Sequence, residues 1–344
     1  MVFMECSHRR ELAAAMCVAL AFTAGAARAQ TSPAEIHVSS QALVLDQAER
    51  TQHTISDRLT AITPADGGGV WAGLTDGSGD LEKRGYDKGS YNAHGLMIGA
   101  DMQVGENGLV GIVVQADSSS ADFDHLPGRA KAKSTGATVY GKLEGETWYA
   151  TATAGGASID ADTSATRVPD VGTLTLHTNS SRTDTLGSAR IESGLRGYAG
   201  HTIWMPFIAL NYDRLKRDAF REEGAGDLGI QAASASYGQL TAQVGVRMSR
   251  VWSWRGGDTT WHAYALYQQI ATGNALTFNA SFEGTPDASF VASGVNMPRR
   301  SAWVGVGMNT EFSDHWSWYL NVDAKAARGD VQAAVASAGM RRMF

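Results

Sequence analysis

The amino-acid sequence predicts an all-β chain whose strands, about twelve in number, close into an antiparallel barrel that crosses a membrane. Three observations predict it. Apolar and polar residues alternate with a period of two from Val70 onward, and short and long connections alternate along the chain. The alternating segments run about ten to fourteen residues, above the five or six usual in soluble strands and enough to cross a bilayer when tilted.

The composition supports many strands with tight turns rather than helices. The chain has 344 residues with 39 Gly, only 7 Pro and 19% charged residues. Glycine-rich turns and strands rich in aromatic residues suit a β protein. The net charge of −6 indicates no nucleic-acid partner.

Residues 1–29 are predicted to be a secretory signal peptide. Arg9 and Arg10 precede the apolar stretch LAAAMCVALAFTAGA, and residues 27–29 form an A-x-A cleavage site. Both cysteines, Cys6 and Cys17, lie within this segment. The processed chain is therefore expected to contain no disulfide, thiolate metal site or cysteine nucleophile.

A polar helix is predicted next, after a short N-terminal segment at residues 30–38. Ser39 or Ser40 is expected to cap the helix, Pro64 to stop it, and residues 39–65 to comprise the helix and its linker. A thin apolar stripe recurs at helical spacing, formed by Leu45, Ala48, Gln52, Ile55, Leu59 and Ile62. A helix with so narrow a stripe lies in water or in a wet cavity.

Residues 66–344 are predicted to form the barrel. In HWSWYLNVDAKAA, Trp318, Leu320 and Val322 share one face, and Asn321, Asp323 and Lys325 share the other. The predicted strands are 70–76, 91–103, 108–121, 131–144, 147–160, 185–199, 202–216, 235–250, 260–271, 301–312, 315–327 and 331–344. Residues 276–298 are interpreted as a hairpin within a long loop, and two membrane strands there would raise the count to about fourteen.

The connections sort by length, which distinguishes this pattern from a soluble β-sandwich. Short links are predicted at 104–107, 144–146, 199–201, 254–258 and 313–314, and long ones at 77–90, 122–130, 161–184, 217–234 and 272–300, while the last connection on the long side, at 327–330, is brief. A soluble sandwich has no reason to separate its loops in this way. Outer-membrane barrels have short periplasmic turns, longer extracellular loops and aromatic residues near both interfaces.

These features together resemble the C-terminal translocator domain of classical (type V) autotransporters. The resemblance covers about residues 40–344, and its most specific parts are GGGVWAGL at 67–74 and SAGMRRMF at 337–344. It implies a twelve-stranded barrel in the outer membrane of a Gram-negative bacterium, reached after Sec-type export, with the helix inside the lumen. It also implies contact with membrane lipid, barrel-assembly machinery and periplasmic chaperones, and we expect a monomeric barrel.

The resemblance assigns roles to the helix and to the last strand. The polar flank of the helix is expected to pair with charges on the barrel's inner face; the flank comprises Asp46, Glu49, Arg50, Asp57 and Arg58, and the inner charges Arg190, Glu192, Arg196, Arg247 and Asp323. The alternative is a helix exposed in the periplasm. Phe344 and Met340 are expected to belong to the assembly signal, although Arg342 stands where the family favours Tyr.

The sequence departs from the family in its N-terminal part. Residues 30–38 offer only a minimal or residual passenger, and the helix lacks the paired asparagines at which some members cleave themselves. We therefore expect an outer-membrane translocator or anchor with a minimal or lost passenger, without self-cleavage in the helix. One alternative is a pore or transport protein gated by its lumen helix.

A second alternative is a surface hydrolase. Asp122, Asp124 and His125 fall in one predicted loop, where a carboxylate could orient the histidine and another could help activate water. A solvated acidic loop explains the same residues. The sequence has no G-x-S-x-G or H-E-x-x-H motif, and we expect no catalytic residue, cofactor or metal site.

Overall fold

The structure is a computed structural model that describes residues 34–62, 67–81, 86–124, 127–167, 175–254, 257–273, 275–327 and 331–344. The predicted signal peptide, Pro64 and His125 lie outside these residues. All the described residues belong to one compact unit, Ser32–Phe344.

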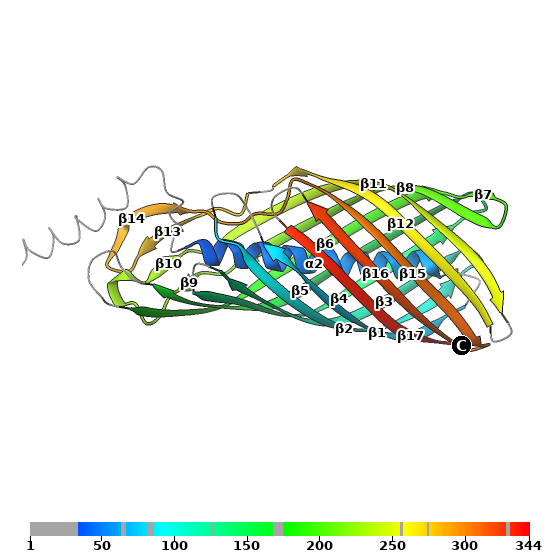
Figure 1. The fold of residues 1–344 in the computed structure, drawn as a ribbon, viewed down its shortest axis with the longest axis horizontal. Coiled ribbons are helices and arrows are strands. Elements are labelled where there is room, and N and C mark those ends of the chain that lie inside the picture. Colours follow the sequence, from blue (N-terminus) through cyan, green and yellow to red (C-terminus); the bar gives the residue numbers. More distant parts are fainter. Residues whose placement is uncertain are drawn as a thin grey trace, which may run out of the picture. The chain divides into compact units, whose positions relative to one another are not determined.

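Twelve long antiparallel strands form a closed barrel, as predicted (Figure 1). Each strand pairs with the next, β8 pairs with β11, and β1 closes the barrel against β17 in a register that joins Gly69 to Met343 and Leu81 to Val331. The short strand β7 (Gly197–Ala199) lies beside β8. The barrel strands are β1 (Gly69–Leu81), β2 (Gly89–Val104), β3 (Gly108–Phe123), β4 (Gly128–Glu144), β5 (Trp148–Arg167), β6 (Leu176–Leu195), β8 (Thr202–Arg217), β11 (Ala235–Trp254), β12 (Gly257–Thr272), β15 (Arg300–Ser313), β16 (Trp316–Ala327) and β17 (Val331–Met343).

The barrel is apolar outside and polar inside, the reverse of a soluble protein. Leu74, Val306 and Ile208 are 60–65% exposed on the outer face, whereas Arg247, Asp323 and Lys325 are buried on the inner face. An exposed apolar band this extensive requires an apolar solvent. The alternation therefore places apolar side chains toward lipid and polar side chains toward the interior, as in a membrane barrel.

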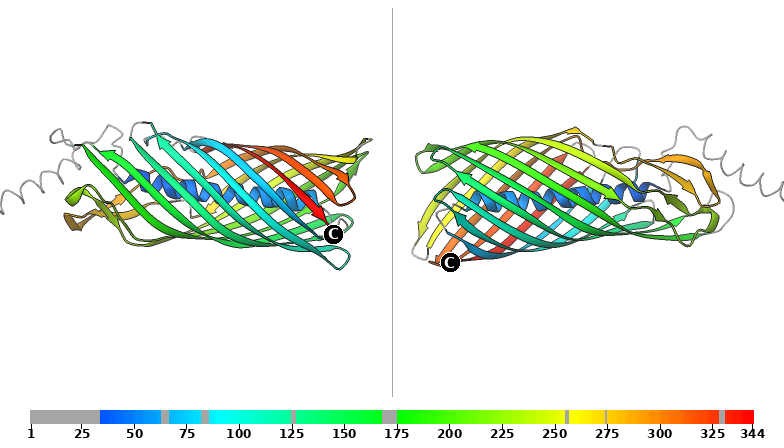
Figure 2. Two further views of the ribbon diagram at one scale, coloured as in Figure 1. Left: turned by 90° about the horizontal axis from the view of Figure 1, so that it is seen from below. Right: turned by 180° about the vertical axis from the view of Figure 1, so that it is seen from behind.

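A single helix, α2 (Glu35–Ala61), runs through the interior of the barrel (Figures 1 and 2). It begins before the predicted caps Ser39 and Ser40, and the Ser40 hydroxyl donates to the carbonyl of His37 within the helix instead. Tertiary contacts replace a local cap, because Glu35 accepts the backbone N–H of Asp87 at 2.6 Å and Val38 packs in an apolar cluster with Phe278. None of the helices among the described residues combines the length and apolar character needed to span a membrane.

The two ends of the barrel differ. One end, here the short-turn end, carries the tight connections such as Gly105–Asn107 and Gly200–His201. At the other, the long-connection end, the strands continue beyond their predicted limits, so much of the loops predicted at 77–90, 122–130 and 161–184 is strand. The backbone ladder continues there although the outward residues become polar, because cross-strand hydrogen bonding does not depend on a lipid-facing side chain.

A second, four-stranded sheet lies at the long-connection end. It consists of β9 (Phe220–Arg221), β10 (Ile230–Ala232), β13 (Phe278–Phe282) and β14 (Thr285–Ala292), in the order β14-β13-β10-β9, with a 3₁₀ turn at Gly226–Leu228. The hairpin β13–β14 falls where a loop hairpin was predicted, which confirms twelve rather than fourteen barrel strands. This sheet, called the mouth sheet below, packs Phe220, Phe278 and Ala280 against the first turns of α2.

Candidate functional site

The candidate site is the barrel lumen, which α2 occupies along its length. From Glu35 to Leu59 the side chains of α2 are buried, apart from the partly exposed Glu49. The predicted apolar stripe packs against one side of the wall: Leu45 and Ala48 share a cluster with Ile159 and Leu186, and Ile55 and Leu59 share one with Trp71 and Met97. The helix is thus held by burial on one side and by polar contacts elsewhere.

The first turns of α2 meet polar groups from β5, from β6 and from Glu222, which directly follows β9 of the mouth sheet. The His37 ring approaches the Glu222 carboxylate at 2.7 Å and Thr163 at 3.2 Å, and it packs on Phe220 with 4.2 Å between ring centroids. Arg182 donates to Ser40 at 2.8 Å and to the carboxylate of Asp184. Helix, wall and mouth sheet therefore share one buried network at this end.

Lys325 is the central contact between the helix and the wall. Its ammonium group, fully buried on β16, lies 3.2 Å from Asp46 and 2.6 Å from Glu49. Asp46 also accepts from Arg50 at 3.0 Å and from the Tyr91 hydroxyl at 2.7 Å. Glu49 accepts from the indole of Trp303 at 2.8 Å and from Gln268. These buried charges are matched, which is the condition for keeping them out of water.

A second charge cluster centres on Glu192 of β6. Its carboxylate accepts from Arg190 at 2.7 Å, from the Tyr149 hydroxyl at 2.9 Å and from Arg247, with which it forms a buried ion pair. The helix joins this cluster through Ser56, whose hydroxyl lies 3.3 Å from both Glu192 and Arg247. Two of the predicted inner charges, Glu192 and Arg247, thus contact the helix through a serine rather than through Asp57, and Arg190 joins them through Glu192.

The last turn of α2 is anchored near the short-turn end by Asp101 of β2. Asp101 forms ion pairs with Arg58 and, at 3.0 Å, with Arg341 of β17, and it accepts from the Tyr140 hydroxyl at 3.1 Å. The Arg58 guanidinium also lies 4.2 Å above the ring of Trp71. Lys142 donates to the carbonyl of Ile62, so a cation satisfies the C-terminal end of the helix.

The structure places all five predicted helix residues in the lumen, four of them in named ion pairs or hydrogen bonds. Asp57 is buried within the fields of Asp323 and Arg247. Arg196 does not face the helix and instead donates to Glu144 at 2.5 Å, near the short-turn end. Sequence reasoning missed Lys325, Asp101 and Tyr91 as partners, although the alternation does put Lys325 and Asp101 on the inner face.

The last strand presents Met340 and Phe344 outward. Phe344 is 78% exposed, and its backbone N–H donates to the carbonyl of Gly68 at 3.0 Å, which ties the terminus to the start of β1. Arg342 also points outward and lies 5.9 Å from the ring of Trp316. Its neighbour Arg341 points inward to Asp101. The alternation predicted for this strand is confirmed.

Of the three residues considered for a surface hydrolase, Asp122 and Asp124 lie among the described residues. Asp122 is held in an exposed ion pair with Arg129 at 2.5 Å, and the proposed partner His125 lies outside the described residues. Among the described residues no group of three or more His, Cys, Asp or Glu side chains is arranged to hold a metal ion.

Comparisons with known proteins agree with this architecture. Residues 70–323 match the family model of the autotransporter β-domain. A segment of 108 residues is 31% identical to the autotransporter lipoprotein NalP of Neisseria meningitidis serogroup B, and it covers 31% of this chain and 10% of that protein. The matched segment thus spans a tenth of the relative's length.

Two solved structures are similar in fold. The translocator domain of NalP from Neisseria meningitidis superposes with a TM-score of 0.75 at 19% identity, over 91% of this chain and all of that domain. The β-domain of the Bordetella autotransporter BrkA superposes with a TM-score of 0.58 at 16% identity, over 81% of this chain and all of that domain. The match to the autotransporter β-domain model does not favour the alternatives of a gated pore and a surface hydrolase.

We predict that Lys325→Met will lower the free energy of unfolding by about 3–5 kcal/mol, because it leaves Asp46 and Glu49 buried without their shared cation. Urea titration measures the change in the free energy of unfolding, with unfolding monitored by the loss of the faster electrophoretic mobility of the compact barrel. Adding Glu49→Gln to this variant should restore part of the loss. Lys133→Met, on the exposed outer face, is the matched control, and an equal loss in that variant would contradict the assignment.

Proposed function

Because the chain belongs to the autotransporter β-domain family, we propose that this outer-membrane translocator barrel carries the segment preceding α2 to the cell surface and then keeps α2 in its lumen. The family is one of transport and anchoring barrels.

The direction of α2 supports the proposal. Its C-terminal end leads to β1, which begins at the short-turn end, and its N-terminal end packs against the mouth sheet at the long-connection end. In outer-membrane barrels short turns face the periplasm and long loops face outside. A segment joined to the N-terminal end of α2 therefore emerges at the cell surface, whatever its length.

The wall contacts suggest how export ends. A chain moving through the lumen passes an inner surface rich in hydrogen-bonding groups. Any polypeptide backbone can replace its hydrogen bonds to water with hydrogen bonds to these groups. When α2 enters the lumen, Asp46 and Glu49 reach Lys325, and Arg58 reaches Asp101. The matched charges then favour one resting position over all others, and the helix stays there as the anchor of the exported segment.

The outward face of the last strand suggests how the barrel is assembled. Met340 and Phe344 are exposed together at the periplasmic end of β17, and they offer an apolar edge to barrel-assembly machinery. We include this machinery and periplasmic chaperones among the proposed partners. Arg342, beside Trp316, can extend to lipid headgroups without interrupting that edge.

An epitope inserted immediately before Ala34 tests the export directly. We expect antibody to bind this epitope on intact cells, because the N-terminal end of α2 faces outside. The same epitope inserted at Glu106, in a periplasmic turn, should bind only after the outer membrane is permeabilised. Binding at both sites only after permeabilisation would contradict the proposed export and orientation.

Deleting Phe344 tests the assembly role. We expect the variant to reach the outer membrane in lower amounts and to accumulate in the periplasm, since the apolar edge loses its most exposed aromatic side chain. Phe344→Tyr, which keeps the ring, should assemble nearly normally. Membrane fractionation with quantitative immunoblotting measures both, and full assembly after the deletion would contradict the role.

A further inference from the structure

The outer face of β8 ends in two basic side chains. From Trp204 to Tyr212 the outward residues of this strand are apolar or aromatic, and Trp204, Ile208 and Tyr212 are each more than 40% exposed. The next outward residues are Arg214 and Lys216, both exposed. They follow the apolar band directly, at its extracellular end.

The neighbours of this basic pair are small or hydroxyl-bearing. Arg214 is paired in register with Gly187 on β6 and Gly238 on β11, and Lys216 with Thr185 and Ser236. A side-chain carbon added at Gly187 would meet no atom within 4 Å, so the space beside Arg214 is open. The patch therefore combines two cations with two hydroxyl groups, and none of the four residues paired with these cations is a carboxylate.

Basic residues on the outer face of β4 have a different setting. Lys131 and Lys133 stand opposite Asp162 and Asp160, and Arg129 is ion-paired with Asp122. Arg214 and Lys216 form no ion pair with any residue that the structure describes. The charge of the β8 pair is thus left for a partner outside the chain.

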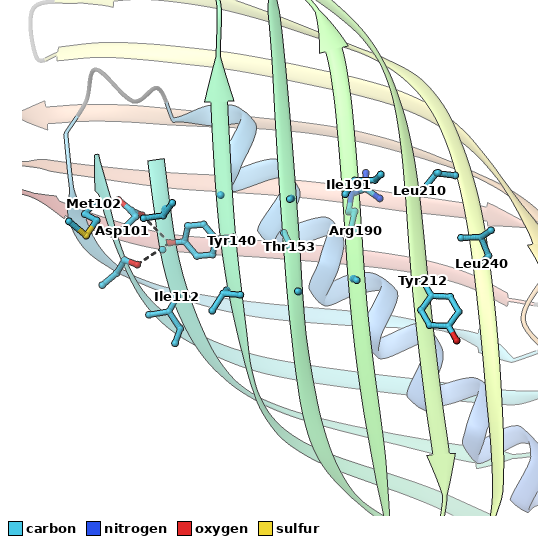
Figure 3. Close-up of a pocket in the computed structure, with 18 residues that line it drawn as sticks. Asp101, Met102, Ile112, Tyr140, Thr153, Arg190, Ile191, Leu210, Tyr212 and Leu240 are labelled. Atoms are coloured by element: carbon cyan, nitrogen blue, oxygen red, sulfur yellow. Dashed lines mark hydrogen bonds between the residues drawn. The ribbon is translucent and has the colours of Figure 1, made fainter. Parts of the chain in front are cut away.

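An apolar groove adjoins the pair on the lipid-facing surface. It has a volume of about 1040 Å³ and crosses the outer wall from β2 to β11, and Figure 3 shows α2 behind the strands that carry it. Ile191, Leu210 and Tyr212 line the part nearest Arg214, and the small residues Ala152, Ala154 and Ala189 line its middle. Tyr212 joins the two features, since it lines the groove and precedes Arg214 on the same face.

We propose that Arg214 and Lys216 bind the phosphate of a phosphorylated lipid in the extracellular leaflet, with an acyl chain of that lipid in the groove. A guanidinium recognises phosphate through paired hydrogen bonds, and a nearby ammonium adds charge. The groove supplies apolar surface at the depth where acyl chains lie. The site requires the orientation proposed above, which the epitope experiment tests separately from lipid binding.

Binding of purified lipid A that carries two phosphates to the full chain in detergent tests the site, with native mass spectrometry to measure the affinity. We expect Arg214→Gln/Lys216→Gln to bind roughly ten- to thirtyfold more weakly, as two surface cations contribute about a factor of five each. Lys131→Gln/Lys133→Gln is the matched control and should stay within about twofold of the parent, because its lysines face carboxylates.

Two further measurements distinguish the contribution of the lipid headgroup from that of the acyl chain. Lipid A without phosphates should bind the parent chain as weakly as the phosphorylated form binds the Arg214 and Lys216 variant. Ala154→Leu/Ala189→Leu, which fills the groove, should weaken binding while leaving the basic pair intact, and millimolar inorganic phosphate should not displace the lipid. Equal affinity of parent and Arg214 and Lys216 variant, or displacement by inorganic phosphate alone, would overturn the proposal.

Discussion

The structure depends on one constraint: a closed barrel in lipid turns its polar side chains inward, and those side chains need partners there. Strands in a membrane must pair all their backbone groups, which closes the sheet and removes its edges. Closure then encloses Asp101, Glu192 and Lys325 in a narrow space. Helix α2 supplies such partners, because Asp46 and Glu49 form ion pairs with Lys325, and Arg58 forms one with Asp101. Without the helix, water would have to solvate these wall charges.

The same constraint explains which parts of the fold could be predicted from the sequence. The period-two alternation is strict wherever one face meets lipid, so the positions of the strands and their two faces could be predicted. Beyond the bilayer the outward residues do not have to be apolar, so the sequence at 161–167 and 176–184 is interpreted as loop although both segments are strand. The start of α2 was missed because contacts of Glu35 and Val38 with distant segments replace a sequence-local cap.

The contacts of the site were harder to predict than its location. The alternation puts Lys325 and Asp101 on the inner face, but the height of the helix within the barrel decides which inner charge meets Asp46. Arg196 illustrates the difficulty, since it is expected to contact α2 and instead pairs with Glu144 near the short-turn end. On the outside, Arg214 and Lys216 stand out only when the register shows glycine, threonine and serine beside them. Pairing in space, rather than residue type, distinguishes a matched charge from a free one.

Helix α2 closes the lumen by completing its charge network. Single-channel conductance in planar bilayers tests this most directly, by comparison of the full chain with a chain that lacks residues 35–61. We predict low, infrequent conductance for the full chain and a large, persistent conductance for the shortened one, whose polar lumen fills with water. Equal conductance from two correctly folded barrels would contradict the claim, because the helix would then contribute nothing to closing the lumen.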